Sequence, residues 1–447
     1  MATNDSMTEV DSTHELPELR EAEKNDLDAT GPENPGSAID EIPDGGATAW
    51  LVVFGTWCTS FCSFGWINST FTMHNRLDSI SANLLHHGHG VYSIPSLSII
   101  IRILTSDLLQ GPVVGRLYDL YGPRRLILGG TLLHVFGLMM ASLSTKYYQI
   151  LLSQGICSAI GASAIFQPAL STVPQWFNKK RGAAFGICST GSSLGGVIFP
   201  IMLTHLIGQV GFPWAMRISA FLILFLLIMA NLTVRQRVVS HSKVSMKQDH
   251  LAPFREPKSL FLMSGFFLVT FGIFIPIDYV VVEARASGMG NGILQYLVPI
   301  LNAASFFGRS SSGLIGDKLG RFNVFSAVCT MTGILILGLW IPASNNAGLI
   351  SFAAFFGFFS GAYISLSPAL VAEISPPAEF GYRGGLLFMC GSIGGLVTNP
   401  IAGAILDADN GSFTGLKVFA GVFCLVGTVV VFGARLHETG FKLAAKY

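Results

Sequence analysis

The sequence predicts an all-α membrane protein with twelve transmembrane helices in two pseudo-symmetric six-helix halves. Three observations predict this class: little charge, long apolar segments and an internal repeat. Only 12% of the 447 residues are charged and 51% are hydrophobic, whereas a soluble domain carries about 25% charge. A helix that crosses a bilayer needs about 20 mostly apolar residues. Twelve segments meet this requirement, near 49–71, 91–114, 126–144, 147–172, 183–207, 214–234, 259–282, 292–314, 323–342, 348–372, 384–406 and 416–434.

The internal repeat has three members that occur in the same order in both halves. The sequence Pro-Ala-Leu at 168–170 returns at 368–370, and GSSLGGVIFP at 191–200 returns as GSIGGLVTNP at 391–400. The third pair is GRLYDLYG, which begins at Gly115, and GLIGDKLG, which begins at Gly313. Two similar halves are the architecture of many secondary transporters, whose solute site lies between the halves.

Charge divides the chain into tails, bundles and a linker. The first 44 residues hold 13 of the 26 acids and two of the 27 bases, so the remainder carries 25 bases against 13 acids. This acidic start cannot bury enough apolar surface to fold, which predicts a disordered tail over 1–46. The other predicted parts are a first bundle over 47–234, a linker over 235–258, a second bundle over 259–435 and a C-terminal tail over 436–447.

The distribution of Lys and Arg predicts the orientation. Of the 25 Lys and Arg after the first 44 residues, 18 lie in the C-terminus and in the loops on the same side as the termini, and five lie in the opposite loops. The other two, Arg102 and Arg309, lie inside predicted spans. Since cytosolic loops carry the excess of positive charge, we expect both termini and the linker to be cytosolic, with the protein in the plasma membrane.

Two short loops resemble the signature loop of the major facilitator superfamily. The first, GRLYDLYGPRR, follows the second predicted span, and the weaker GLIGDKLGR follows the eighth. Their glycines allow helices to approach closely, and their Asp side chains can stabilise the N-terminus of a neighbouring helix. We therefore expect a major facilitator fold with a conformational latch. The latch residues are Gly115, Asp119, Gly122, Arg124, Asp317 and Arg321.

The start of the first span, PDGGATAWLVVFG at 43–55, resembles the opening of the monocarboxylate transporter family in its fungal branch. The sequence WFNKKRG at 176–182 resembles the loop before that family's fifth span. This resemblance covers about 43–435 and implies alternating-access transport of a small anionic organic solute, either monocarboxylate-like or a secondary metabolite. An efflux pump dedicated to a fungal secondary metabolite is the alternative within this class, and a non-transporting membrane sensor is the alternative outside it.

Arg309 in the eighth span is the leading candidate for solute binding. It matches the eighth-helix Arg of the proton-coupled members of that family, but their Asp four residues earlier is Ser305 here, and Asn68 or Ser69 occupies the region of their first-helix Lys. A guanidinium offers a permanent charge and a planar fork that suits a carboxylate. We expect Arg309 to hold an anionic group of the solute. The alternative is that it pairs with a membrane carboxylate or with Asn302 and only stabilises the bundle.

Further polar side chains complete the predicted site. A buried carboxyl group can have a raised pKa, so Asp278 and Glu283 are candidates for proton coupling, with a solvated helix end as the alternative. The other candidate solute contacts are Asn302, Asn68, Tyr279, Tyr296 and Asn399. Asn-x-Ser/Thr sequons mark Asn410, in a predicted external loop, and Asn68 as candidate glycosylation sites.

Enzyme and ATP-dependent classes are not supported by any motif. The sequence contains no P-loop, no nucleophilic triad and no metal-ligand spacing, so we expect no catalytic residues, no cofactor and no metal. The expected partners are a small-molecule solute, with or without a proton, and the lipid bilayer. Nucleic acid and ATP are not expected as partners.

Overall fold

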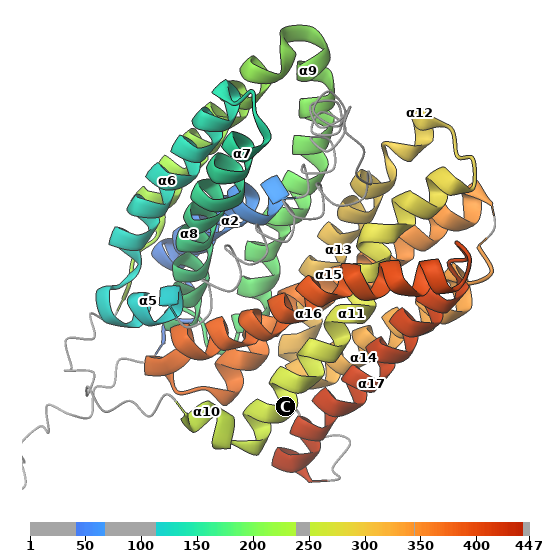
Figure 1. Cartoon of the computed structure of the whole chain (residues 1–447). Helices are drawn as coiled ribbons and strands as arrows, with labels where there is room; N and C mark the ends of the chain where they lie inside the picture. Colours follow the sequence, from blue (N-terminus) through green and yellow to red (C-terminus); the bar gives the residue numbers. More distant parts are fainter. Residues whose placement is uncertain (1–41, 68–112, 238–250, 344, 441–447) are drawn as a thin grey trace, which may run out of the picture. The chain divides into compact units, whose positions relative to one another are not determined.

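The computed structural model describes residues 42–67, 113–237, 251–343 and 345–440. All regular elements in these ranges are helical, as the predicted fold class requires. Nine of these helices are long and apolar enough to cross a membrane. Figure 1 shows the helices up to α9 and those from α10 onward as two groups.

The first group holds five of the predicted crossings. Its helices are α2 (Ala47–Ser60) with the π-helix η1 (Phe61–Gly65), α5 (Gly115–Tyr121), α6 (Pro123–Leu143), α7 (Tyr147–Ile150) with the π-helix η4 (Leu151–Ser158), α8 (Ala159–Thr172), the 3₁₀ turn η5 (Val173–Gln175) and α9 (Arg181–Thr233). The π-helical segments interrupt the α-helical hydrogen-bond pattern of the first and fourth spans, a feature that is frequent at functional sites.

Helix α9 contains two predicted spans. Its 53 residues would extend roughly 80 Å as one straight helix, far more than the hydrocarbon thickness of about 30 Å. At Gly211 the backbone leaves the helical region, with φ 77° and ψ 166°. The chain therefore reverses at this point, between the predicted spans 183–207 and 214–234.

The second group is built in the same way from longer helices. These are α10 (Ala252–Arg255), α11 (Pro257–Ala286), α12 (Asn291–Leu294), α13 (Leu297–Leu319), α14 (Arg321–Leu335) with the π-helix η6 (Ile336–Trp340), α15 (Asn346–Ile374), the 3₁₀ turn η7 (Pro377–Glu379), α16 (Phe380–Ala408) and α17 (Thr414–Thr439). Polar residues such as Asn302, Ser305 and Arg309 leave α13 outside the nine strongly apolar helices.

The described ranges account for eleven of the twelve predicted spans. Nine helices meet the criterion of length and apolarity, α9 contributes a second crossing, and the 23-residue α13 is long enough to cross despite its polar side chains. The predicted span 91–114 lies outside the described residues.

Buried apolar side chains hold the two groups of helices together as well as filling each. One core consists of first-group residues alone, among them Trp66 and Phe199, whose rings meet edge to face at 5.1 Å. A larger core extends from the second group to first-group residues such as Phe166. The Phe166 and Phe388 rings pack edge to face at 6.1 Å, which joins α8 to α16 across the two halves.

Candidate functional site

Asp317 joins α13 of the second half to the start of α9 in the first half. Its two carboxylate oxygens accept hydrogen bonds from the backbone N–H groups of Gly182 and Ala183, each at 2.8 Å. A carboxylate at a helix N-terminus satisfies N–H groups that have no partner within the helix and complements the helix dipole. Asp317 therefore joins the two halves at the end of the bundle where α9 begins, which we name the latch end.

Asp119 makes the corresponding contact from the first half to the second. Its Oδ2 accepts a hydrogen bond of 3.0 Å from the N–H of Tyr382 at the start of α16. The two copies of the repeat thus make reciprocal contacts between the halves. Asp119 of α5 caps α16 in the second half, and Asp317 of α13 caps α9 in the first half. Both contacts lie at the latch end, where α9 and α16 begin.

Glycines make these two contacts possible. A Cβ atom added to Gly182 would lie 2.7 Å from the carbonyl oxygen of Gly313, and one added to Gly381 would lie 2.7 Å from that of Gly115. Such distances are too short for any side chain, so helix backbones touch at both crossings. Gly122 ends α5 with φ 74°, a conformation that favours glycine.

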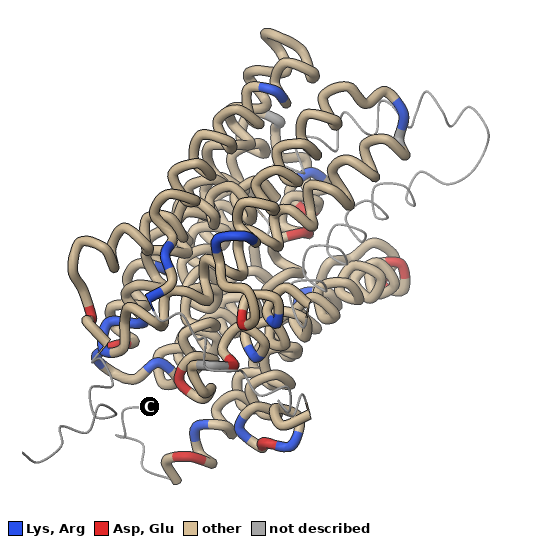
Figure 2. Tube along the Cα trace, turned by 90° about the vertical axis from the view of Figure 1, so that its left-hand side faces the viewer, with Lys and Arg blue, Asp and Glu red and all other residues tan. Residues whose placement is uncertain are grey.

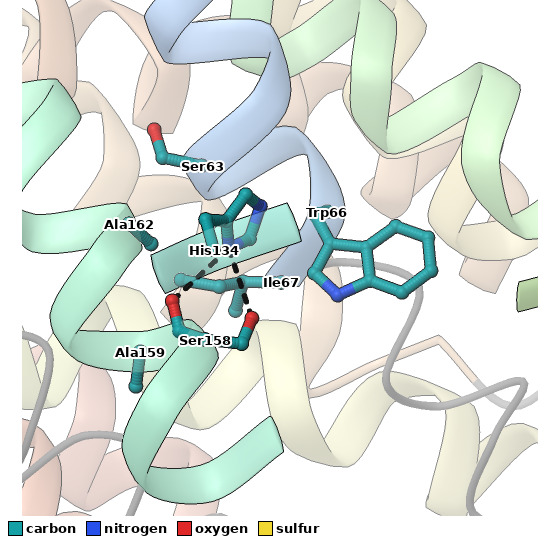
Figure 3. Close-up of a pocket in the computed structure, with 7 residues that line it drawn as sticks. All are labelled: Ser63, Trp66, Ile67, His134, Ser158, Ala159 and Ala162. Carbon is teal, nitrogen blue, oxygen red and sulfur yellow. Dashed lines mark hydrogen bonds between the residues drawn. The ribbon is translucent and has the colours of Figure 1, made fainter. Parts of the chain in front are cut away.

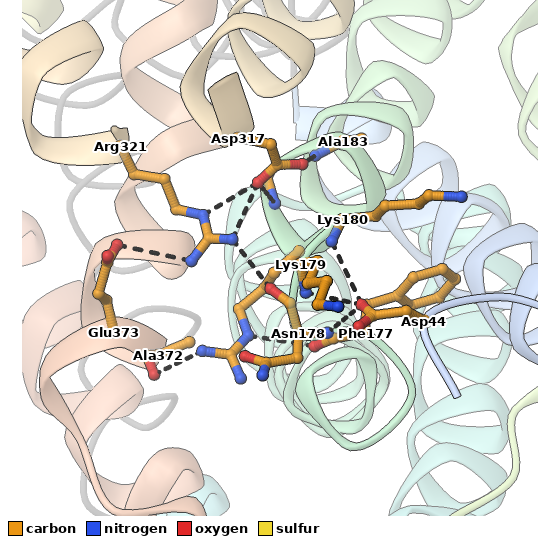
Figure 4. A network of polar contacts seen from close by, with 12 residues as sticks. Asp44, Phe177, Asn178, Lys179, Lys180, Ala183, Asp317, Arg321, Ala372 and Glu373 are labelled. Carbon is orange, nitrogen blue, oxygen red and sulfur yellow. Dashed lines mark hydrogen bonds and ion pairs between the residues drawn. The ribbon is translucent and has the colours of Figure 1, made fainter. Parts of the chain in front are cut away.

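Arg321 extends the Asp317 contact into a network, which Figure 4 shows from close by. Its guanidinium pairs with Asp317 at 2.9 Å and with Glu373 of α15 at 3.5 Å. It also donates a hydrogen bond of 3.0 Å to the carbonyl oxygen of Asn178. Arg124, the remaining predicted latch residue, is exposed and makes no ion pair among the described residues.

A second network holds the start of α16 from within its own half. Arg383 binds both carboxylate oxygens of Glu256 at 2.7 and 2.8 Å and one oxygen of Glu379 at 2.8 Å. The hydrogen bonds from Arg383 lower the pKa of the Glu256 carboxyl group. Since Glu256 directly precedes α11, this cluster fixes the entry to the second bundle beside the residues that Asp119 caps.

The carboxyl group of Asp119 predicts that closure of the latch depends on pH. Burial raises the pKa of its carboxyl group to about 7, despite the opposing hydrogen bonds from Tyr382 and Gly381. The closed latch therefore retains a proton that an open, hydrated latch, with a pKa near 3.9, would release. Closure is most favoured below about pH 4 and loses this contribution as the pH rises to about 7.

A cysteine at the buried Ala372, whose carbonyl oxygen accepts a hydrogen bond from Arg181 at the latch end, would report this effect. We expect maleimide to label this cysteine faster as the pH rises from about 5 to about 7 in the purified protein, after correction for thiol ionisation with a denatured sample. Asp119→Asn should remove the residual pH dependence. An unchanged pH dependence in that variant would show that Asp119 is not the group responsible.

Arg309 lies at the junction of α13 and α9, and it is buried, with 5% of its surface exposed. Its Nη1 donates to the carbonyl oxygen of Ser189 at 2.6 Å and to the hydroxyl of Ser192, while its Nε donates to Ser305 Oγ at 3.0 Å. All these partners are neutral. Within the described ranges no carboxylate lies at ion-pair distance from Arg309, and Nη2 donates to no residue.

Among the described residues, Arg309 therefore pairs neither with a membrane carboxylate nor with Asn302, the two pairings that would give it a purely stabilising role. Asn302 donates instead to the carbonyl oxygen of Val298 on its own helix, at 3.1 Å. Tyr296 precedes α13 and is 42% exposed, away from Arg309 along the helix. Of the predicted solute contacts on α13, Arg309 alone bonds across the two halves, and no carboxylate of the described ranges balances its charge.

Three other predicted residues meet between α11 and α16. The hydroxyl of Tyr279 donates to the carbonyl oxygen of Asn399 at 3.4 Å, and the carboxyl group of Asp278 lies within hydrogen-bonding reach of the Asn399 side chain. These residues form a polar contact inside the second half. Asn68 lies outside the described residues, and Asn410 is exposed in the turn after α16.

Glu283, the second candidate for proton coupling, lies in a closed ion pair. Lys417 of α17 binds its Oε1 at 2.6 Å, and the indole N–H of Trp340 donates to its Oε2 at 2.7 Å. All three side chains are buried. Both carboxylate oxygens are occupied, which favours a stabilising role over exchange of protons with solvent.

This buried pair predicts a large effect on stability. Removing one partner leaves the other charge uncompensated, which costs about 3–5 kcal/mol. We expect Lys417→Met to lower the melting temperature of the purified protein, and Glu283→Gln combined with Lys417→Met to recover most of the loss. Transport by the double variant should persist. If Glu283→Gln instead abolished transport in a fully stable protein, Glu283 would be a proton carrier.

His134 is a buried polar residue that the sequence analysis did not single out. Its Nε2 lies 3.1 Å from the carbonyl oxygen of Cys62, and its Nδ1 lies 3.0 Å from that of Ser158. It therefore bridges the two π-helical segments, η1 and η4. Figure 3 shows its contacts with Ser158. A histidine inside an apolar span was the available signal, because such residues are costly at membrane depth. The small pocket beside it is lined by Ser63, Trp66, Ile67, His134, Ser158, Ala159 and Ala162.

Comparisons with known proteins agree with this architecture. The family model described as Major Facilitator Superfamily matches residues 50–345 and 312–446. The MFS transporter asaE of Aspergillus flavus is 55% identical over 424 residues, which cover 94% of each chain. The Fujikurins efflux protein of Gibberella fujikuroi is 48% identical over 404 residues, which cover 90% of this chain and 85% of that protein.

A similar fold occurs in a solved structure. FucP, a Major Facilitator Superfamily transporter solved in the outward conformation, matches with a TM-score of 0.64 at 15% sequence identity. The match covers 86% of this chain and 99% of FucP.

Proposed function

This chain belongs to the Major Facilitator Superfamily and is a multi-pass membrane transporter, and from that premise we propose that it exports an anionic secondary metabolite by alternating access. In this proposal Arg309 holds the anionic group of the solute between the two halves. The single observation that carries it is the charge of Arg309, which no carboxylate compensates among the residues that the structure describes.

The energetic argument rests on the partners of Arg309. A charge inside a membrane bundle is costly and is normally paired, and the effective penalty for an unpaired buried ion is several kcal/mol. Ser189, Ser192 and Ser305 supply dipoles but no negative charge. An anionic solute would supply it, and the planar guanidinium suits a carboxylate or another oxyanion.

The direction of transport is proposed from the relatives. One similar protein is named for the efflux of fujikurins, which supports export over uptake of a small organic acid. The resemblance to monocarboxylate transporters stays a prediction about the solute class. Asp278, with Tyr279 and Asn399 beside it, would be the proton-coupling group if the export is driven by protons.

The latch contacts support alternating access and an orientation. We propose that the latch end faces the cytosol, with both termini on that side and the protein in the plasma membrane. Figure 2 shows more Lys and Arg at the lower end of the bundle than at the upper end, and cytosolic loops carry the excess of these residues. In the conformation described, the contacts of Asp119 and Asp317 would close the cytosolic side.

The proposal is tested by an untargeted comparison of metabolites inside and outside cells that produce the protein, lack it, or carry Arg309→Gln at equal membrane abundance. Export predicts that anionic compounds accumulate outside only with the unaltered protein, and inside in the other two. Accumulation inside the cells with the unaltered protein would reverse the direction. A cationic or neutral solute that is unaffected by the variant would remove Arg309 from the mechanism.

A further inference from the structure

Asp44, at the entry to the first span, caps the same segment that Asp317 latches. Its Oδ1 accepts hydrogen bonds from the N–H groups of Asn178, Lys179 and Lys180 at 2.6, 2.7 and 3.3 Å. Several successive N–H groups that converge on one oxygen form an anion-binding concavity. The carboxylate that occupies this concavity belongs to the chain itself, as Figure 4 shows.

The two carboxylates bind different backbone N–H groups at the start of the fifth span. Asp44 takes the N–H groups of residues 178–180, and Asp317 takes those of 182 and 183. Asp44 precedes α2 in the same half as this segment, whereas Asp317 belongs to the opposite half. One carboxylate can therefore remain in place when the halves separate, while the other must leave.

The local backbone and an aromatic contact support this arrangement. Asp44 has φ 49°, and Gly46 has φ 94°, so the chain turns sharply between the carboxylate and α2. One helical turn later, Trp50 packs edge to face against Phe177 with ring centroids 5.1 Å apart. Asp44 and Trp50 thus both contact the short loop at 177–180, Asp44 through the loop's backbone N–H groups and Trp50 through the ring of Phe177.

We propose that Asp44 is a positioning residue for the latch, which holds residues 178–180 so that the N–H groups of Gly182 and Ala183 face Asp317. Arg321 strengthens the arrangement, since it joins Asp317 to the carbonyl oxygen of Asn178. The inference rests on the proposed alternating-access function. It adds a residue that acts on the equilibrium between open and closed states through hydrogen bonds within its own half.

The test measures latch opening directly in the purified full-length protein and needs no solute. The reporter is Ala372→Cys, in a background in which Cys157 and Cys390, the two native cysteines that are not buried, are replaced by Ala. Loss of hydrogen bonds with a net contribution of about 1 kcal/mol shifts an equilibrium by a factor of roughly five. Asp44→Ala, which removes three such bonds to residues 178–180, should therefore speed maleimide labelling about fivefold. Asp44→Asn, which keeps an acceptor oxygen without the charge, should give an intermediate rate.

Asp409→Ala is the matched control. Asp409 also accepts a backbone hydrogen bond near a helix start, from Gly415 N at 3.1 Å, but it follows the far end of α16 from the latch. This variant should label at the unaltered rate. Equal labelling of Asp44→Ala and the unaltered protein, or an equal acceleration by Asp409→Ala, would overturn the proposal.

A double variant separates positioning from a merely structural role. If Asp44 acts through Asp317, Asp44→Ala should add little to the labelling rate of Asp317→Ala, whereas independent effects would multiply. If Asp44→Ala does not accumulate, the same comparison is made with Asp44→Asn. If Asp44→Ala exports the solute normally and labels at the unaltered rate, the positioning role of Asp44 is wrong and the proposed transport function stands. If Asp44→Ala labels faster but the unaltered protein exports no anion, the positioning role stands and the proposed solute is wrong.

Discussion

Replacing Arg309 by Gln is expected to reduce export of the anionic solute by on the order of 100-fold, because the loss of one partner of a buried charged contact costs about 2–5 kcal/mol. The measurement is the initial rate of export of the metabolite identified by the cell comparison, at matched membrane abundance. Arg309→Lys should retain part of the activity, since it keeps the charge but loses the fork geometry.

Ser305→Asp provides the converse test of the same idea. A carboxylate at this position would lie beside Arg309 Nε, which already donates to Ser305 Oγ at 3.0 Å. The internal ion pair would compete with an anionic solute and should also suppress export, although the arginine remains in place. Export at the normal rate in Ser305→Asp would indicate that the unbalanced charge of Arg309 is not what binds the solute.

Arg217→Gln is the control for a general effect of losing an arginine. Arg217 also lies in a helix of the bundle and donates to a serine hydroxyl, that of Ser142 at 3.3 Å. Its guanidinium packs on the ring of Trp214 at 5.0 Å and lies at neither the latch nor the Arg309 junction. Near-normal export is expected from this variant. A loss as large as that of Arg309→Gln would point to folding or insertion instead of solute binding.

Asp317→Ala is expected to favour latch opening by on the order of tenfold. The variant removes two charge-assisted hydrogen bonds to the start of α9 and one ion pair with Arg321. Labelling of the cysteine at position 372 should accelerate by this factor, and export should slow because the outward-facing state is depleted.

Asp119→Ala is the matched comparison for Asp317→Ala. Its carboxylate caps α16 in the corresponding way but has no arginine partner among the ion pairs of the described residues. The smaller number of contacts predicts a smaller acceleration of labelling. Labelling that is faster in Asp119→Ala than in Asp317→Ala would contradict this order and assign the main closure to α5 and α16.

The predicted latch shows how far a repeat can be interpreted. The matching Gly and Asp spacings of 115–122 and 313–320 suggested that each Asp could cap a neighbouring helix. In the structure both Asp residues accept backbone hydrogen bonds at the start of a helix of the opposite half. Arg124 shows the limit of this inference, because this basic residue of the signature loop makes no ion pair within the part of the chain that the structure describes. The repeat in the sequence indicates that an Asp can cap a helix. Which helix it caps depends on which helix packs beside it in the structure.

The sequence by itself determined the helical spans and the family, because apolar length, turn residues and short signature loops are local properties of the chain. It also indicated Arg309, since a charge inside a span is visible without coordinates. The tertiary structure decided which side chains meet. Glu283 and Lys417 are 134 residues apart, Arg309 and Ser192 are 117 apart, and Asp44 and Asn178 are 134 apart. These contacts form only where particular faces of two helices pack together. The packing of the whole bundle determines which faces those are.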